Sequence, residues 1–154
     1  MFDISFDRIK TWDGELITIQ QPALIVNVAS KCALSGCQYD ELMKLCKQYP
    51  SLHIYAFPSH WTGQEFETIG EVYDWLHKNY KPPMNFHLMD FVNVNILSSK
   101  EIHPLFDFLL ERTRKIIKIP IKWNFEKFLI DGVKIQRFSP TMLPTKIQVA
   151  VKNV

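Results

Sequence analysis

The three cysteines of this 154-residue chain, Cys32, Cys37 and Cys46, lie close together in the sequence. Cys32 follows the nearly continuous apolar run over residues 23–29 and precedes an amphipathic segment. A thiol at that point lies beside a helix N-terminus, where free backbone N–H groups and positive partial charge favour the nucleophilic thiolate. Lys31 adds a neighbouring cation. The pattern indicates either a reactive thiol at Cys32 or an ordinary buried cysteine.

The other two cysteines fall on different faces of the helix that we predict over residues 37–48. Tyr39, Leu42 and Cys46 recur at the spacing i, i+3, i+7, which is the buried stripe of an amphipathic helix. Cys46 is therefore expected in the core. Cys37 lies well off this stripe and is expected to be accessible.

Hydrophobic periodicity along the chain alternates between strand and helix patterns. Strands are expected over residues 2–9, 16–19, 23–29, 52–57, 85–89, 125–131 and 133–138, with turns at Asp13-Gly14 and Asp131-Gly132. Helices are expected over residues 37–48, from a Thr68/Glu71 capping pair to Tyr80, from His103-Pro104 through Leu110, and from about Thr145. This order predicts a single α/β domain over residues 1–154 with the thioredoxin-like fold, a central mixed β-sheet flanked by helices on both faces.

The charge of the chain is mild but locally concentrated. A net charge of +2 and a pI near 8.4 argue against a nucleic-acid partner. The basic excess lies in the stretch E-R-T-R-K-I-I-K-I-P-I-K at residues 111–122. It is interpreted either as a solvated face or as a surface for an anionic partner, such as a carboxylate reductant or a phosphate headgroup.

Features of the chain ends and of the cysteine count predict the compartment. The first residues include acids and lack an apolar segment of signal-peptide length, and no stretch approaches the roughly 18 apolar residues needed to cross a bilayer. An odd number of cysteines disfavours a structural disulfide framework. We expect a cytoplasmic protein with no integral membrane association.

Several motifs match, in order and approximate spacing, those of one protein family. They are N-V-A-S-K-C at 27–32, F-P at 57–58, G-Q-E at 63–65, H-P-L at 103–105, K-W-N-F at 122–125, F-L at 128–129 and R-F-S-P at 137–140, with Pro144 beyond them. In these motifs the chain resembles the glutathione peroxidases, from about residue 6 to residue 144. The resemblance implies the thioredoxin fold and a peroxidase activity.

The resemblance also implies roles for individual residues. In that family a cysteine or selenocysteine attacks a hydroperoxide, and a Trp, an Asn and a Gln converge on it. Cys32 matches the peroxidatic cysteine, and Trp123 and Asn124 match the donors that stabilise the sulfur anion and orient the peroxide. Without the resemblance, the same pair is interpreted as a core Trp and a turn Asn ahead of a strand.

The loop that carries the family's Gln is altered in this chain. The family pattern F-P-C-N-Q-F-G-x-Q-E is replaced by F-P-S-H-W-T-G-Q-E, which is one residue shorter. Ser59 takes the Cys place, His60 the Asn place and Trp61 the place of the catalytic Gln. Trp61 can supply an N–H donor but no acceptor, and His60 can supply either, depending on its tautomer, so both are candidate catalytic residues. Gln64 matches the later, structural Gln. Loss of one donor at such a site typically costs roughly 10²–10³ in rate, so the loop is consistent with a slower peroxidase, a rebuilt loop or a lost activity.

A second thiol is needed if the oxidised cysteine is to be resolved within the chain. The usual cysteine of the altered loop is replaced by Ser59, and Cys37 is the local candidate, because some peroxiredoxins of the same fold use a C-x4-C pair. Five helical residues rise about 7.5 Å, beyond the roughly 7 Å between Cα atoms that a disulfide tolerates. The first helical turn would therefore have to unwind. The alternative is an inert surface thiol.

The sequence thus predicts a thiol peroxidase that reduces hydrogen peroxide and organic or lipid hydroperoxides through Cys32. Thioredoxin or glutathione regenerates it, and no cofactor or metal is needed. The rival is a weakened or inactive family member that acts as a redox sensor or binding module. Tetrameric family members carry an insertion ahead of the H-P-L motif, and the stretch from Pro82 to His103 is short here, so the resemblance implies a monomer with an open site.

Overall fold

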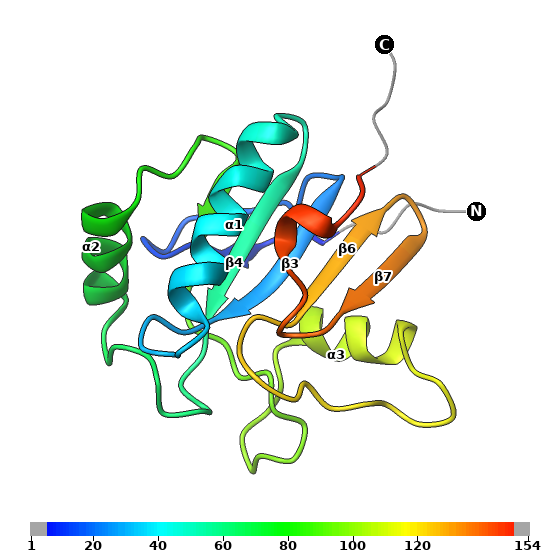
Figure 1. Ribbon diagram of the computed structural model, residues 1–154. Helices are drawn as coiled ribbons and strands as arrows, with labels where there is room; N and C mark the ends of the chain where they lie inside the picture. The colour runs from blue at the N-terminus through cyan, green and yellow to red at the C-terminus, as the bar shows by residue number, and fades with distance from the viewer. Residues whose placement is uncertain (1–5, 150–154) are drawn as a thin grey trace.

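The computed structural model describes residues 6–149 and is built on a five-stranded sheet of order β5-β4-β3-β6-β7 (Figure 1). Strands β3 (Ala23–Val28), β4 (His53–Pro58) and β5 (Phe86–Leu88) are parallel. Strand β6 (Lys127–Asp131) runs antiparallel to β3, and β7 (Lys134–Phe138) runs antiparallel to β6. The predicted mixed sheet is confirmed.

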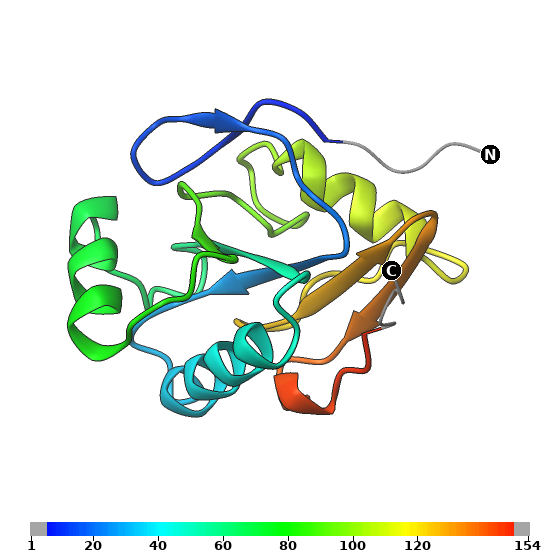
Figure 2. The ribbon, with the colours of Figure 1, turned by 90° about the horizontal axis from the view of Figure 1, so that it is seen from above.

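Helices cover both faces of this sheet, as predicted. Figure 2 shows α1 (Ser35–Gln48) on one face and α3 (Pro104–Arg112) on the other. Helix α2 (Ile69–Asn79) packs into the core on the α1 side through its buried residues. The Thr68 hydroxyl oxygen accepts the Glu71 N–H at 3.3 Å, which confirms the capping pair at the start of α2.

Strand β3 is buried on both faces because each face meets a separate apolar cluster. Leu24, Val26 and Val28 belong to the cluster that contains α1, whereas Ala23 and Ile25 belong to the cluster that contains α3. This burial fixes the carboxyl end of β3, from which the chain turns toward Cys32.

Two predicted elements are shorter in the structure. The first hairpin consists of β1 (Ile9–Lys10) and β2 (Leu16–Ile17), and residues 2–5 of its predicted first strand lie outside the described residues. The predicted final helix is wrong: only a 3-10 turn, η1 (Pro144–Lys146), forms there. Ile147 and Val149 are buried and separated by one exposed residue, so the chain runs extended to place both in the α1-side core.

Helix length and hydropathy bear on membrane association. Within residues 6–149, none of the helices has both the length and the apolar character needed to cross a bilayer.

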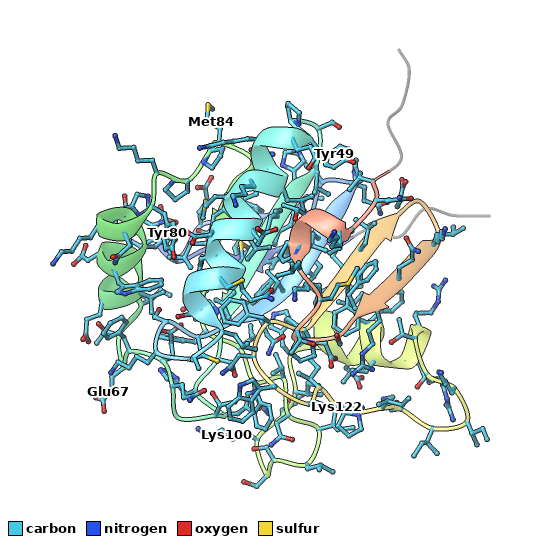
Figure 3. The ribbon with its side chains drawn as sticks, in the orientation of Figure 1. Tyr49, Glu67, Tyr80, Met84, Lys100 and Lys122 are labelled. Carbon is cyan, nitrogen blue, oxygen red and sulfur yellow. The ribbon has the colours of Figure 1, made fainter. Side chains whose placement is uncertain are left out.

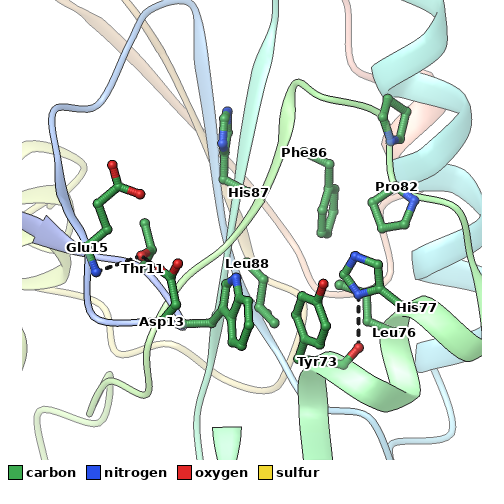
Figure 4. A pocket seen from close by; sticks show the side chains of 12 residues that line it. Thr11, Asp13, Glu15, Tyr73, Leu76, His77, Pro82, Phe86, His87 and Leu88 are labelled. Carbon is green, nitrogen blue, oxygen red and sulfur yellow. Dashed lines mark hydrogen bonds between the residues drawn. The ribbon is translucent and has the colours of Figure 1, made fainter. Parts of the chain in front are cut away.

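His53 and His87 form a pair on neighbouring strands, with Nδ1 of His53 3.0 Å from Nε2 of His87. His87 also stacks on Tyr55, with ring centroids 4.7 Å apart. Together with Trp12 and Tyr73 it lines a pocket between the first hairpin, α2 and β5 (Figure 4). Burial, and secondarily the neighbouring His53, lowers the pKa of His87 to about 4.

Acidification is expected to destabilise the fold through His87. The folded pKa lies below the unfolded value of about 6.5, so stability present above that value is lost as the pH falls toward about 4. Between pH 7 and pH 5, the free energy of unfolding is expected to fall by about 2 kcal/mol because of His87. Urea unfolding at both pH values measures this fall in the free energy of unfolding. In His87→Gln the fall should be smaller than in the wild type by about this amount. Equal losses in the two proteins would contradict the assignment.

Candidate functional site

Cys32 lies in the turn between β3 and α1 and is 6% exposed. Its Sγ accepts the Leu34 backbone N–H at 3.4 Å, and its carbonyl accepts the Ser35 N–H at 3.0 Å. Helix α1 begins at Ser35, two residues earlier than predicted. The sulfur therefore faces a backbone N–H donor at the start of a helix.

The cysteine turn is fastened to the loop that follows β4. The Glu65 carboxylate Oε1 accepts the Ser30 N–H at 3.1 Å and the Phe66 N–H at 2.9 Å. Burial raises the pKa of Glu65, while these donors act in the opposite direction. The Lys31 ammonium lies over the Phe66 ring, 4.6 Å from its centroid. Glu65 thus holds the backbone on the N-terminal side of Cys32.

Asn27 of β3 clamps the segment that carries Trp123 and Asn124. Its Nδ2 donates to the Trp123 carbonyl at 3.1 Å, and its Oδ1 accepts the Glu126 N–H at 3.1 Å. The Phe125 N–H donates to the Asn27 carbonyl at 2.6 Å. Phe125 has a φ of 69°, a left-handed conformation that costs roughly 1–3 kcal/mol in a non-glycine residue. The clamp holds this segment at the strand end from which the cysteine turn leaves.

Asn124 is fully buried and is bonded to the loop after β4. Its Nδ2 donates to Gln64 Oε1 at 3.0 Å, and its Oδ1 accepts the Thr62 hydroxyl at 3.1 Å. The Gln64 carbonyl accepts the Lys31 N–H at 2.9 Å. A continuous chain of contacts therefore links Asn124, through Gln64, to the residue next to Cys32.

Trp61 packs against Trp123 rather than entering this hydrogen-bond chain. The two rings meet edge to face with centroids 6.2 Å apart. The Trp61 indole N–H is buried and has no partner among residues 6–149, whereas the Trp123 side chain is 39% exposed. Trp61 thus supplies an aromatic wall beside Trp123.

His60 is exposed and directed to neighbouring loops. Its Nε2 lies 2.9 Å from the Phe66 carbonyl, and its ring lies 4.1 Å from that of Phe91, centroid to centroid. With Ser59 and Trp61 it lines a hollow of about 340 Å³. The structure places His60 at the rim of the site.

The two remaining thiols differ as predicted. Cys46 is 1% exposed, and burial raises its pKa to about 12. Cys37 is exposed in the first turn of α1. Because α1 begins only at Ser35, the expected five-residue helical separation between Cys32 and Cys37 does not occur.

A buried lysine lies near Cys37. Lys127 is fully buried, and its Nζ donates to the carbonyls of Ser139, Pro140 and Met142 at 3.3, 3.0 and 2.7 Å. Burial lowers the pKa of Lys127 to about 7, and the charges of Glu126 and Cys37 act in the opposite direction.

Two residues of this arrangement were not among the candidates predicted from sequence. Asn27 is the one polar residue in the apolar strand β3, and a buried Asn needs partners for its amide, which was a usable signal. Gln64 was predicted to be structural. In the structure its amide oxygen is the acceptor for Asn124.

Gln64→Ala is expected to slow the reaction with peroxide by about tenfold or more, because Asn124 then loses the acceptor that orients its amide. Trp61→Gln is expected to change the rate by less than about threefold, because the indole N–H has no partner to lose. Stopped-flow rates for both variants, with thermal midpoints as the folding control, test this ranking. The opposite ranking would assign the chemistry to Trp61.

A cysteine between a central parallel strand and the following helix, on a mixed sheet covered on both faces, is the arrangement of thioredoxin-fold thiol proteins. The sequence model of the family described as "Glutathione peroxidase" matches residues 5–110, more than half of the chain. The chain belongs to the glutathione peroxidase family, whose named members are peroxidases and therefore oxidoreductases.

Individual relatives agree with this assignment. The chain is 34% identical to "Glutathione peroxidase" of Lactococcus lactis subsp. cremoris, over 97% of this chain and 96% of that one. It is 35% identical to "Probable phospholipid hydroperoxide glutathione peroxidase" of Nicotiana sylvestris, over 100% of this chain and 92% of that one. It spans only 61% of the length of a chloroplastic Arabidopsis thaliana relative to which it is 34% identical.

A solved structure supports the fold. The crystal structure of T. cruzi GPX1 is similar with a TM-score of 0.64 at 31% identity, covering 88% of this chain and 84% of that one.

Proposed function

We propose that this protein is a thiol peroxidase that reduces hydrogen peroxide and organic or lipid hydroperoxides through Cys32. The observation that supports it best is the chain of contacts from Asn124 through Gln64 to the cysteine turn. The Cys32 thiolate attacks the terminal peroxide oxygen, an S–O bond forms, and the O–O bond breaks. The leaving group is hydroxide from hydrogen peroxide or an alkoxide from an organic hydroperoxide, and it takes up a proton to depart as water or an alcohol. Cys32 is left as a sulfenic acid.

Cys37 is the proposed resolving thiol. Its thiolate attacks the sulfenic sulfur of Cys32, an S–S bond forms, and water leaves. The first turn of α1 is suited to local opening, because the N-cap residue, Leu34, provides no side-chain hydrogen bond. Cys37 is exposed in this first turn, where a reaction partner can reach it. Thioredoxin or glutathione would then reduce the disulfide. The proposed protein acts as a monomer in the cytoplasm, where both reductants are available.

An open site supports organic as well as inorganic hydroperoxides. Trp123 is 39% exposed, and the hollow of about 340 Å³ beside Trp61 is lined by apolar residues, including Phe91 and Val92, as well as by polar ones, including Asn93 and Lys100. The Nicotiana relative is named for phospholipid hydroperoxides. No cofactor enters the proposed cycle, because the electrons come from the two thiols and then from the reductant.

Oxidised protein is expected to contain a Cys32–Cys37 disulfide that thioredoxin reduces, with Cys46 left free. Peptide mapping under non-reducing conditions tests the pairing, and NADPH-coupled turnover with thioredoxin or with glutathione identifies the reductant. Cys37→Ser should retain the first oxidation but lose most thioredoxin-dependent turnover. A stable Cys32 sulfinate or glutathione adduct, with Cys37 still alkylatable, would instead indicate a one-cysteine cycle.

A redox sensor or binding module is the rival function, and the loop after β4 is the observation that favours it. Trp61 stands where the resemblance places the family's catalytic Gln, and its N–H is buried without a partner among residues 6–149. A chain that is oxidised by peroxide but shows no turnover with either reductant would support this rival.

A further inference from the structure

The pocket that contains His87 has walls that the proposed peroxide chemistry does not use. It lies between the β1–β2 turn, α2 and residues 82–88 and has a volume of about 320 Å³ (Figure 4). We call it the hairpin pocket. Cys32, Trp123 and Asn124 are not among its lining residues. Its volume falls at the lower end of the range found for small-molecule sites.

A column of stacked rings forms one wall of the hairpin pocket. The Trp12 and Tyr73 rings stack with centroids 3.9 Å apart, and Tyr73 stacks in turn on His77 at 4.0 Å. His77 Nδ1 donates to the Tyr73 carbonyl at 3.0 Å, so a neutral His77 keeps Nε2 as an acceptor. The buried Phe86 adds another ring to the lining. Rings of this kind favour a ligand with an apolar body, and their faces also attract cations.

Two carboxylates lie toward the other side of the pocket. Figure 4 shows Asp13 and Glu15 on one side of His87 and Phe86 on the other. The Thr11 hydroxyl donates to the Asp13 carboxylate, and this hydrogen bond lowers the pKa of Asp13. Asp13 therefore stays ionised at neutral pH.

Neighbouring cations do not neutralise these carboxylates. Among residues 6–149, neither Asp13 nor Glu15 forms an ion pair, and none of the described lining residues is a lysine or an arginine. Lys10, which precedes the turn, is paired with Asp90 at 3.5 Å. The pocket thus has a negative side and an aromatic side, which together complement a cation carried on an apolar body.

The turn that carries the carboxylates is held by its own hydrogen bonds. The Thr11 N–H donates to the Glu15 carbonyl at 2.8 Å, and the Gly14 N–H donates to the Thr11 carbonyl at 3.0 Å. The Trp12 N–H donates to the Leu88 carbonyl at 3.2 Å, which fastens the turn to β5. A site that is formed before binding loses less conformational entropy when its ligand binds.

From these features we propose that the hairpin pocket binds an arylalkylamine, which is a protonated amine joined by a short chain to an aromatic ring. The ammonium meets Asp13 and Glu15, and the ring packs against Tyr73 and Phe86. A metal ion would leave the rings unused, and residues 6–149 contain no group of three or more His, Cys, Asp or Glu side chains that could hold one. This binding does not depend on the proposed peroxidase activity.

Titration of the full chain with phenethylamine, followed by ¹H–¹⁵N correlation spectra, tests the proposal. The amide signals of Trp12, Glu15 and His87 should shift, with a dissociation constant of about 1 mM or below. The anion 3-phenylpropionate has the same ring on a similar chain and should bind at least about tenfold more weakly. Ethylamine keeps the ammonium but lacks the ring, and it should also bind at least about tenfold more weakly.

Two variants separate the contributions of the walls. Asp13→Asn/Glu15→Gln should weaken phenethylamine binding by about tenfold, because both exposed charges are removed. Tyr73→Leu should weaken it by about fivefold or more, because the ring is lost from the wall while an apolar side chain remains. Thermal midpoints should show that both variants are folded.

Glu67→Gln is the matched control for the loss of a carboxylate. Glu67 is exposed and lines a different hollow. Figure 3 shows Glu67 at the opposite end of the molecule from Met84, which follows the pocket residue Pro83. This variant should bind phenethylamine as the wild type does.

Cys32→Ser should also bind phenethylamine normally, which separates this binding from peroxide chemistry. Equal affinities for phenethylamine and 3-phenylpropionate would overturn the proposal, as would ethylamine binding as tight as that of phenethylamine. Equal weakening in Glu67→Gln and in the Asp13/Glu15 double variant would overturn it as well, because the attraction would then come from the overall charge of the protein.

Discussion

Cys32→Ser is expected to lose at least about 1,000-fold in the second-order rate with hydroperoxide, roughly 4 kcal/mol of barrier. A serine hydroxyl stays protonated at neutral pH, so the donors around position 32 have no anion to stabilise. The Leu34 N–H that contacts Sγ at the start of α1 can stabilise an anion but cannot replace the missing nucleophile. Stopped-flow measurement of peroxide consumption by the reduced protein gives the rate.

The other two cysteines provide the controls for this substitution. Cys46→Ala should react at the wild-type rate, because burial raises the pKa of Cys46 to about 12 and leaves it a thiol. Cys37→Ser should preserve the first oxidation step. A wild-type rate in Cys32→Ser would assign the chemistry to another residue.

Arg137→Ala is expected to lower the free energy of unfolding by about 3–5 kcal/mol. Arg137 Nε donates to Glu126 Oε2 at 2.8 Å, and the side chains are only 16% and 4% exposed. Removing the guanidinium leaves a buried carboxylate without its counter-ion. It also frees the Ile119 and Pro120 carbonyls, so the segment leading to Trp123 loses an anchor.

Arg114→Ala is the matched control for the loss of an arginine. Arg114 pairs with Glu111 at 3.0 Å, but the two side chains are 45% and 47% exposed. An exposed pair typically contributes 1 kcal/mol or less, so this variant should be destabilised by no more than about 1 kcal/mol. Urea unfolding of both variants measures the difference, and similar losses would refute the importance of the buried pair.

Local patterns predicted most of the fold because each has a local physical cause. The apolar run at 23–29 required a strand buried on both faces, and β3 is such a strand. Asp131-Gly132 predicted the last hairpin, and Gly132 adopts a φ of 65° there. The final helix failed because burial of Ile147 and Val149 outweighed the local helical pattern after Thr145.

The candidate site was less predictable because its contacts join distant parts of the chain. The pairing of Asn27 with Trp123 spans 96 residues, and that of Asn124 with Gln64 spans 60. Position in the loop pattern suggested Trp61 and His60 as donors, but packing turned Trp61 against Trp123 and His60 toward Phe66. The spacing of residues along the sequence does not determine which of these packing contacts a side chain makes.

Intact mass spectrometry after one equivalent of hydrogen peroxide, followed by mapping of the alkylated cysteines, tests most directly whether peroxide oxidises Cys32. We expect rapid loss of a mass equal to two hydrogen atoms, with Cys32 and Cys37 protected from alkylation and Cys46 still reactive after unfolding. A mass that stays unchanged, with Cys32 fully alkylatable, would contradict the claim that Cys32 is the residue that peroxide oxidises.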